Sequence, residues 1–328
     1  MNTTDTLQRC VLIGLLMLLG PLTALATDQH RVLPGDTLWT LAEHYWGDAD
    51  RWSDLARYNR ITDVHQLPPG TLLSLTPPPV AQVTHVQGDA WLLTDADLRA
   101  LENDALLQAN VRLQTGVDAF LVLSFADGSE AVIPSQTRVR LVHADDSIQL
   151  TLEAGAVESH IAPQKRLGGF QVHTPAGIIG VRGTRFRVQY QPDQSLAVSV
   201  FSGAVALDLP ALAADAQPLQ DNQGYWQRGD QHFQGPLLPA PALRQNWQRR
   251  GTSLQLELEP VAGARFYRIG RARDQRFTTL VEEHTVSEPK VVLQQVTEPA
   301  LYLRVSALDE HGIEGQIALH VLWQQRAP

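Results

Sequence analysis

The sequence has 328 residues with 26 basic and 35 acidic side chains, so its formal net charge is −9. An acidic chain is a poor match for the phosphate backbone of nucleic acids, and we expect no nucleic-acid partner. The single cysteine, Cys10, lies close to the start, so the rest of the chain has no disulfide, thiolate nucleophile or thiolate metal ligand.

The first 26 residues predict a secretory signal peptide. A short polar start with Arg9 as its only cation precedes an apolar run that ends in Ala24-x-Ala26, the small residues a signal peptidase needs. The run is shorter than the roughly 20 residues of a spanning helix, and Gly20-Pro21 interrupts it. We expect cleavage after Ala26 and a periplasmic chain of about 300 residues in two or three domains, with no later membrane span. An uncleaved membrane anchor is the alternative.

Residues 29–76 predict a small strand–helix–helix–strand domain. Apolar residues recur at helical spacing from Leu38 to Tyr45 and from Trp52 to Asn59, and "LPPGTLLSL" predicts a turn and a closing strand. The segment resembles a LysM domain over its whole length, from the "GDTL" opening to "PPGTLL". It departs from the usual pattern in "NRITDVHQLPPG", where Arg60 follows the asparagine. The resemblance implies a groove that binds N-acetylglucosamine chains of peptidoglycan.

The resemblance places this groove between the loop after the first strand and the loop before the last. The residues it implies are Gly35, Asp36, Thr37 and Leu38 on one wall, and Asn59, Ile61, Leu67 and Pro69 on the other. Main-chain groups at the helix start would bond acetamido groups, and apolar side chains would pack on the sugar. The alternative is that Asp36 only caps a helix and Leu38 only belongs to the core. We expect Trp39, Trp46 and Trp52 to serve mainly in packing.

Residues 77–81 predict a stiff proline-rich linker, and residues 82–210 predict an all-β domain of short alternating strands such as "FLVLSF". "LEAGAV" and "VFSGAV" indicate one strand–turn–strand corner used twice. The region resembles a FecR domain nearly end to end, most specifically in "TPAGIIGVRGTRFRV". This resemblance implies a roll- or solenoid-like stack of strands.

The glycines of "HTPAGIIGVRGTRFRV" raise the question of a phosphate-binding loop. The stretch lacks the lysine of a P-loop, and "TRFRVQY" continues as a strand where a dinucleotide-binding loop would begin a helix. We therefore interpret it as a structural corner, with glycines at positive φ or close backbone approach. We expect Arg182 to bond main-chain carbonyls across the corner and Thr184 to start the next strand. The motif residues are Thr174, Gly177, Gly180, Arg182, Gly183 and Thr184.

Residues 211–245 are rich in proline and glycine and predict a connecting segment. Residues 246–326 predict strands at roughly ten-residue spacing, which is typical of a β-sandwich. "ARFYRIGRARD" and "LYLRVSALDEHGIEG" are similar to fibronectin type III-like modules. The whole chain is thus predicted to be a mainly β, multi-domain protein.

No catalytic, metal or cofactor site is expected. The sequence has neither a Gly-x-Ser-x-Gly elbow nor a His-Glu-x-x-His motif, and its eleven histidines are scattered. Asp145-Asp146 and Glu282-Glu283 fall at turn-like positions, and we interpret them as solvated rather than as a glycosidase pair.

Three functions remain in competition. The first is a non-enzymatic periplasmic protein that LysM anchors to peptidoglycan while the β domains hold an unidentified envelope protein. The second is a FecR-type signalling regulator; only ten residues precede the apolar run, so another protein would have to carry the cytoplasmic part. The third, a cell-wall hydrolase, is disfavoured because nucleophile, metal ligands and catalytic domain are all missing. We favour the first.

Overall fold

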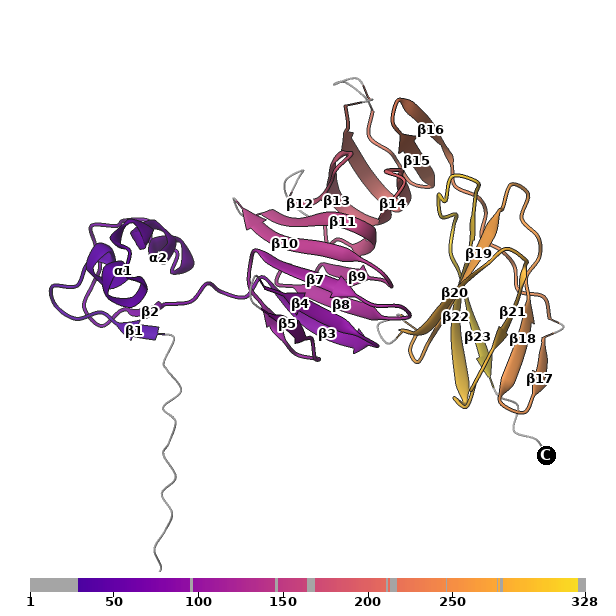
Figure 1. Cartoon of the computed structure of the whole chain (residues 1–328), viewed down its shortest axis with the longest axis horizontal. Helices are drawn as coiled ribbons and strands as arrows, with labels where there is room; N and C mark the ends of the chain where they lie inside the picture. Colours follow the sequence, from indigo (N-terminus) through magenta and orange to yellow (C-terminus); the bar gives the residue numbers. More distant parts are fainter. Residues whose placement is uncertain are drawn as a thin grey trace, which may run out of the picture. The chain divides into compact units, whose positions relative to one another are not determined.

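The computed structural model describes residues 29–323, apart from 95–96, 145–146, 164–168, 211, 213–216, 246, 276 and 278–279. The predicted signal peptide and the Asp145-Asp146 pair therefore lie outside the described residues. The chain divides between Pro78 and Pro79, inside the predicted linker, into two compact units (Figure 1).

The N-terminal unit has the predicted strand–helix–helix–strand order. Its elements are β1 (Gln29–Arg31), α1 (Leu38–Trp46), the 3-10 turn η1 (Ala49–Arg51), α2 (Trp52–Tyr58) and β2 (Leu72–Ser74). Helix α1 begins at a capping box, in which the hydroxyls of Thr37 and Thr40 each accept a hydrogen bond from the other residue's backbone N–H. It ends at Gly47, whose φ of 66° suits glycine. The apolar faces of both helices bury Leu41 and Leu55 against the strand pair.

The first part of the C-terminal unit is a single sheet of 14 strands, here called the roll (Figure 1). Its strands are β3 (Ala81–Gln87), β4 (Ala90–Leu93), β5 (Leu98–Ala100), β6 (Leu106–Leu107), β7 (Val111–Thr115), β8 (Phe120–Phe125), β9 (Glu130–Ile133), β10 (Arg138–Ala144), β11 (Ser147–His160), β12 (Phe170–Thr174), β13 (Gly177–Tyr190), β14 (Leu196–Asp208), β15 (Gln223–Arg228) and β16 (Gln231–Pro236). The first half of β11 pairs with β10 and β12, and its second half pairs with β9 and β13. The sheet therefore folds over one shared core, which includes Leu121, Val157 and Phe186.

The predicted repeated corner is present in β11 and β14. Gly155 and Gly203 have φ of 93° and 90°, and each faces a threonine, Thr137 and Thr184 respectively. The threonine hydroxyl bonds the backbone of the residue that follows the glycine, at 3.0 Å in the first corner and 2.9 Å in the second. A Cβ on Gly155 would lie 2.6 Å from the Cα of Thr137, so both the conformation and the space require glycine.

The segment predicted as a connection, 211–245, contains strands β15 and β16, which extend the roll beyond β14. The prediction missed them because one face of β15 buries a polar glutamine and the other buries Gly224, which adds no apolar side chain to the pattern. Tyr225 is completely buried, and its hydroxyl donates to the side-chain oxygen of Gln227 at 3.0 Å. A glutamine satisfied in this way occupies a core position that the sequence pattern assigns to an apolar residue.

The remaining strands form the predicted β-sandwich. They are β17 (Gln248–Arg250), β18 (Ser253–Glu257), β19 (Phe266–Ala272), β20 (Leu280–Val286), β21 (Lys290–Leu293), β22 (Ala300–Leu308) and β23 (Ala318–Trp323). Their sheets have the orders β17-β18-β21 and β20-β19-β22-β23, and they enclose a core that includes Leu256, Ile269 and Leu303. The sandwich belongs to the same compact unit as the roll. Ile313, for example, packs on Ala197 and sits where a side chain at position 224 would be.

Candidate functional site

The two loops that the LysM resemblance implies as groove walls lie side by side. The backbone N–H of Val32 donates to the carbonyl of Thr71 at 2.8 Å, and the N–H of Gly70 donates to the carbonyl of Val32 at 2.7 Å. These bonds continue the β1–β2 pairing into the loops, so residues 33–37 and 67–71 face each other across the end of the strand pair.

Asp36 holds the first loop in shape. Its Oδ2 accepts from the backbone N–H of Leu33 at 2.7 Å and lies 2.7 Å from Nε2 of His30, whose Nδ1 is 2.9 Å from the Tyr45 hydroxyl. The backbone bond from Leu33, followed by the bond with His30, lowers the pKa of the Asp36 carboxyl below its ordinary value. Because Thr37 is the helix cap, Asp36 positions the loop rather than capping α1.

Asn59 ties the end of α2 to β2. Its Nδ2 donates to the carbonyls of Leu55 and Ser74 at 2.8 and 2.9 Å, and its Oδ1 accepts from the backbone N–H of Ser74 at 2.7 Å. The next residue, Arg60, has φ of 53°, and the N–H of Ile61 closes the helix end on the carbonyl of Ala56 at 2.9 Å. The amide of Asn59 is thus committed to the fold.

The other predicted groove residues differ in what they can offer a ligand. Gly35, Thr37 and Pro69 are exposed, whereas Ile61 and Leu67 are half-buried against the core. Leu38 is 0% exposed, because the first turn of α1 points its side chain into the core. The predicted contact between this side chain and a sugar is therefore wrong.

Sequence reasoning missed two exposed leucines that flank the same loops. Leu33 is 58% exposed and Leu72 is 52% exposed, although both lie beside the paired strands β1 and β2. The signal was an apolar residue next to a Pro-Gly turn, since Leu33 directly precedes Pro34-Gly35 and Leu72 follows Pro69-Gly70 by one residue. Trp39 and Trp52 stack with centroids 4.6 Å apart, and Arg51 lies over Trp46 at 4.4 Å. All three tryptophans are half-buried against the core, as expected for packing.

The glycine motif of the roll is a hairpin and a corner within continuous strands. The Thr174 hydroxyl accepts from the N–H of Ala176 and donates to the carbonyl of Gly177, which closes the β12–β13 turn. Gly177 has φ of 143°, and a Cβ there would collide with the Asp208 carbonyl, whereas at Gly180 the nearest atom lies 4.0 Å away. The corner falls at Gly183, with φ of 59°, within β13.

Thr184 lies inside strand β13, so the expectation that it starts the next strand is wrong. Its hydroxyl donates to the carbonyls of Arg182 and Ala204, so it fixes the corner between β13 and β14 instead.

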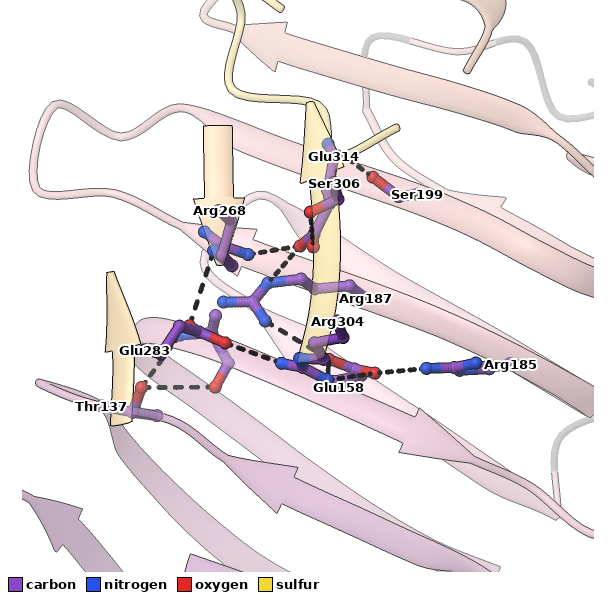
Figure 2. Close-up of polar contacts among 11 residues, drawn as sticks. Thr137, Glu158, Arg185, Arg187, Ser199, Arg268, Glu283, Arg304, Ser306 and Glu314 are labelled. Carbon is purple, nitrogen blue, oxygen red and sulfur yellow. Dashed lines mark hydrogen bonds and ion pairs between the residues drawn. The ribbon is translucent and has the colours of Figure 1, made fainter. Parts of the chain in front are cut away.

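A buried ion cluster lies where the roll meets the sandwich, and sequence reasoning missed it (Figure 2). Its members are Glu158, Arg185 and Arg187 from the roll, and Arg268, Glu283, Arg304 and Glu314 from the sandwich. Both oxygens of Glu158 accept from Nη1 of Arg304, at 3.1 and 2.9 Å. Nη2 of Arg304 donates to Glu283 at 2.7 Å. Glu283 is therefore paired and only 11% exposed, and Glu282, which pairs with Arg271, lies in the same strand β20. The interpretation of both as solvated turn residues is wrong.

The charges in this cluster depend on one another. Burial alone would raise the pKa of Glu158, but its arginine neighbours, Arg304 first, outweigh that cost and lower the pKa to about 2. Glu283 shows the same balance, with burial opposed by Arg268 and Arg304, and its pKa is also lowered. A second link runs through Glu314, whose carboxylate accepts from Arg268 and from the Ser306 hydroxyl, while its N–H donates to the Ser199 hydroxyl at 3.0 Å.

Comparison with protein-family models matches the LysM domain to residues 30–76 and the FecR protein family to residues 111–206. The chain carries a LysM domain and a FecR domain. The FecR match begins at β7 and ends within β14, so β3 to β6, β15 and β16 extend the roll beyond it. LysM domains bind peptidoglycan-type glycans, both families are non-catalytic, and both are typical of cell-envelope proteins.

Two crystal structures of a proposed anti-sigma factor from Parabacteroides distasonis are similar to part of the chain. Their sequences are 20% and 21% identical to it, with TM-scores of 0.34 for both, and each match covers 38% of this chain. The chain spans 59% of the length of either structure. Comparison with curated proteins finds no match.

Within the described part of the chain, no group of three or more histidine, cysteine or acidic side chains is arranged to hold a metal ion. No helix of residues 29–323, taken with the gaps above, is long and apolar enough to cross a membrane.

Proposed function

We propose that this protein is a non-enzymatic, peptidoglycan-bound protein of the bacterial periplasm. The LysM domain anchors it to N-acetylglucosamine-containing glycan, and the roll and sandwich together hold an envelope protein. The observation that carries the proposal is the pair of facing loops, 33–37 and 67–71. Asp36 and the backbone bonds of Val32 hold them in place, while Gly35, Thr37 and Pro69 stay exposed.

Those loops suit a glycan. Exposed main-chain groups beside a helix start can bond acetamido groups, and the exposed Leu33 and Leu72 supply an apolar surface for sugar faces and methyl groups. The signal peptide, cleavage after Ala26 and the periplasmic location belong to this proposal, since peptidoglycan lies outside the cytoplasmic membrane.

Co-sedimentation with purified peptidoglycan sacculi tests the proposal. We compare the unaltered chain with the double variant Leu33→Ser, Leu72→Ser, which leaves the bonds of Asp36 and Asn59 intact. The matched control is Leu98→Ser, Leu106→Ser in the roll, where the leucines are 56% and 65% exposed. We expect the groove variant to bind at least tenfold more weakly and the control to pellet like the unaltered chain. Equal binding by all three would refute the groove.

The FecR match favours a second candidate, a regulatory protein that acts through a partner held by the roll. In this case deletion of the protein changes the transcription of a restricted set of genes, and a chain that lacks the LysM domain, residues 29–76, but keeps residues 1–26 restores the original transcription. Unchanged transcription on deletion would remove this candidate and leave the scaffold.

A further inference from the structure

Strand β23 is an open edge of the sandwich. It pairs with β22 on one side, in an unbroken register from Val305↔Ala318 to Ala300↔Trp323, and the sheet order ends there. Every second backbone N–H and C=O of its six residues therefore points away from the sheet, which is the template on which another strand can add.

The outer face of β23 is entirely apolar, and His320 is the one polar side chain of the strand, on the inner face. Ala318 and Leu322 pack against the sandwich core, while Leu319, Val321 and Trp323 are 53%, 38% and 67% exposed on the outer face. Three exposed apolar side chains at every second position form a continuous stripe along the edge. The strand "ALHVLW" has no acidic side chain, lysine, arginine, proline or glycine.

The other three edges of the sandwich are protected. Strand β20 carries Glu282 and Glu283 and has a register shift against β19. Strand β17 carries Arg249 and Arg250, and β21 carries Lys290. Charges and bulges of this kind keep edges from pairing with other chains, and β23 has neither.

We propose that β23 pairs antiparallel with β23 of a second copy of the chain, about a two-fold axis through Val321. A two-fold axis normal to the sheet keeps the outer face of both strands on one side, so the two stripes join. In this register Val321 lies opposite itself and Leu319 lies opposite Trp323, an aliphatic–aromatic pair of the kind that stabilises antiparallel strands. The two four-stranded sheets become one sheet of eight.

A second copy fits this edge better than a charged strand. Because β23 has no formally charged side chain at neutral pH, self-pairing brings no like charges together, and a charged partner would gain no ion pair. A register centred on His320 would set two imidazoles opposite each other and leave Trp323 beyond the paired residues. Trp323 also lines a pocket of about 90 Å³ beside Trp247 and Leu322.

Cysteine cross-linking of the full chain in a Cys10→Ser background tests the register. Directly opposed residues of antiparallel strands have Cα atoms about 4.5–5.5 Å apart, within the about 4.4–6.8 Å that a disulfide requires. We expect Val321→Cys to form a covalent dimer under mild oxidation. The controls Leu319→Cys, which faces Trp323, and Val117→Cys, 68% exposed in the roll, should stay monomeric. Cross-linking of Val321→Cys no greater than that of Val117→Cys would overturn the proposal.

Sedimentation equilibrium tests the surface without a cross-link. We expect the unaltered chain to dimerise and Val321→Arg, which sets two cations opposite each other, to weaken the dimer at least a hundredfold. Val117→Arg is the matched control, and circular dichroism confirms that both variants are folded. A chain that is monomeric at 100 µM, or a dimer that Val321→Arg leaves intact, would overturn the proposal; should Val321→Arg not fold, the cysteine comparison decides alone.

Discussion

Replacing Arg304 by methionine should destabilise the C-terminal unit by about 3–5 kcal/mol, the usual cost of breaking a buried ion pair from one side. Arg304 contacts Glu158 and Glu283 at 2.9 and 2.7 Å, and the change leaves both carboxylates buried without their closest cation. The lowered pKa of Glu158 agrees in direction, because Arg304 is the first of the cations that outweigh the cost of burying this carboxylate.

Urea unfolding at pH 7, followed by the fluorescence of tryptophans in the C-terminal unit, measures this loss. The control is Arg228→Met, since Arg228 pairs with Asp193 at 3.4 Å while both side chains are 53% exposed. An exposed pair of this kind contributes less than about 1 kcal/mol. A cost for Arg304→Met no larger than that for Arg228→Met would refute the reasoning.

The same cluster predicts a pH dependence. The folded pKa of Glu158 is lowered, so its contribution is complete above about pH 4.5 and is lost as the pH falls toward about 2. Glu158→Gln should therefore be less stable at pH 7 but lose less stability than the unaltered chain between pH 5 and pH 3. Equal losses over that interval would show that Glu158 is not held as an anion.

Three further substitutions test the local structure, each by thermal or urea unfolding. Gly177→Ala should destabilise the roll by more than about 2 kcal/mol, because Gly177 has φ of 143° and a Cβ there would collide with the Asp208 carbonyl. The control Gly180→Ala, whose Cβ would have 4.0 Å of room, should change the stability by less than about 1 kcal/mol. Similar losses for the two variants would contradict the special role of Gly177. Asn59→Ala should destabilise the LysM domain by about 1–3 kcal/mol, because the Ser74 N–H loses its partner, and an unchanged midpoint in Trp39 fluorescence would show otherwise. Arg60→Gly should stabilise the same domain by about 0.4–1 kcal/mol, since Arg60 has φ of 53°. The control Arg57→Gly, inside helix α2, should destabilise it. A loss of stability in Arg60→Gly would argue against the left-handed helix cap.

Local patterns were sufficient to predict most of the fold. Helical spacing in 38–45 and 52–59 marks α1 and α2, and strand alternation marks the β domains. The glycines of "LEAGAV" and "VFSGAV" marked the two corners of the roll, because a residue with positive φ and no room for a Cβ is visible in sequence as glycine. Strands β15 and β16 were missed where a buried glutamine and tyrosine replaced the expected apolar pattern.

The ion cluster could not be predicted from the sequence, for a different reason. Glu158 and Arg304 are 146 positions apart, and no local pattern links them. Arg268 and Arg304 alternate along their strands with the core residues Ile269 and Leu303, which is the pattern of a solvent-facing side. That side of the sandwich faces the roll instead. Arg268 and Arg304, which the alternation predicts to be solvent-exposed, are therefore buried and paired.

The interface makes the roll and the sandwich one mechanical unit. They share buried ions, the contact of Phe120 with Ala272 and Leu280, and the packing of Ile313, so we expect a change that destabilises one of them to destabilise the other. The LysM core is formed by residues between Val32 and Leu75, among them Leu38 and Leu55. In the function proposed above, this domain is the anchor that binds the glycan. The predicted linker already reaches into the roll, because Ala81 is buried in its core and Val80 packs against that core, so the stiff connection is limited to Pro77–Pro79.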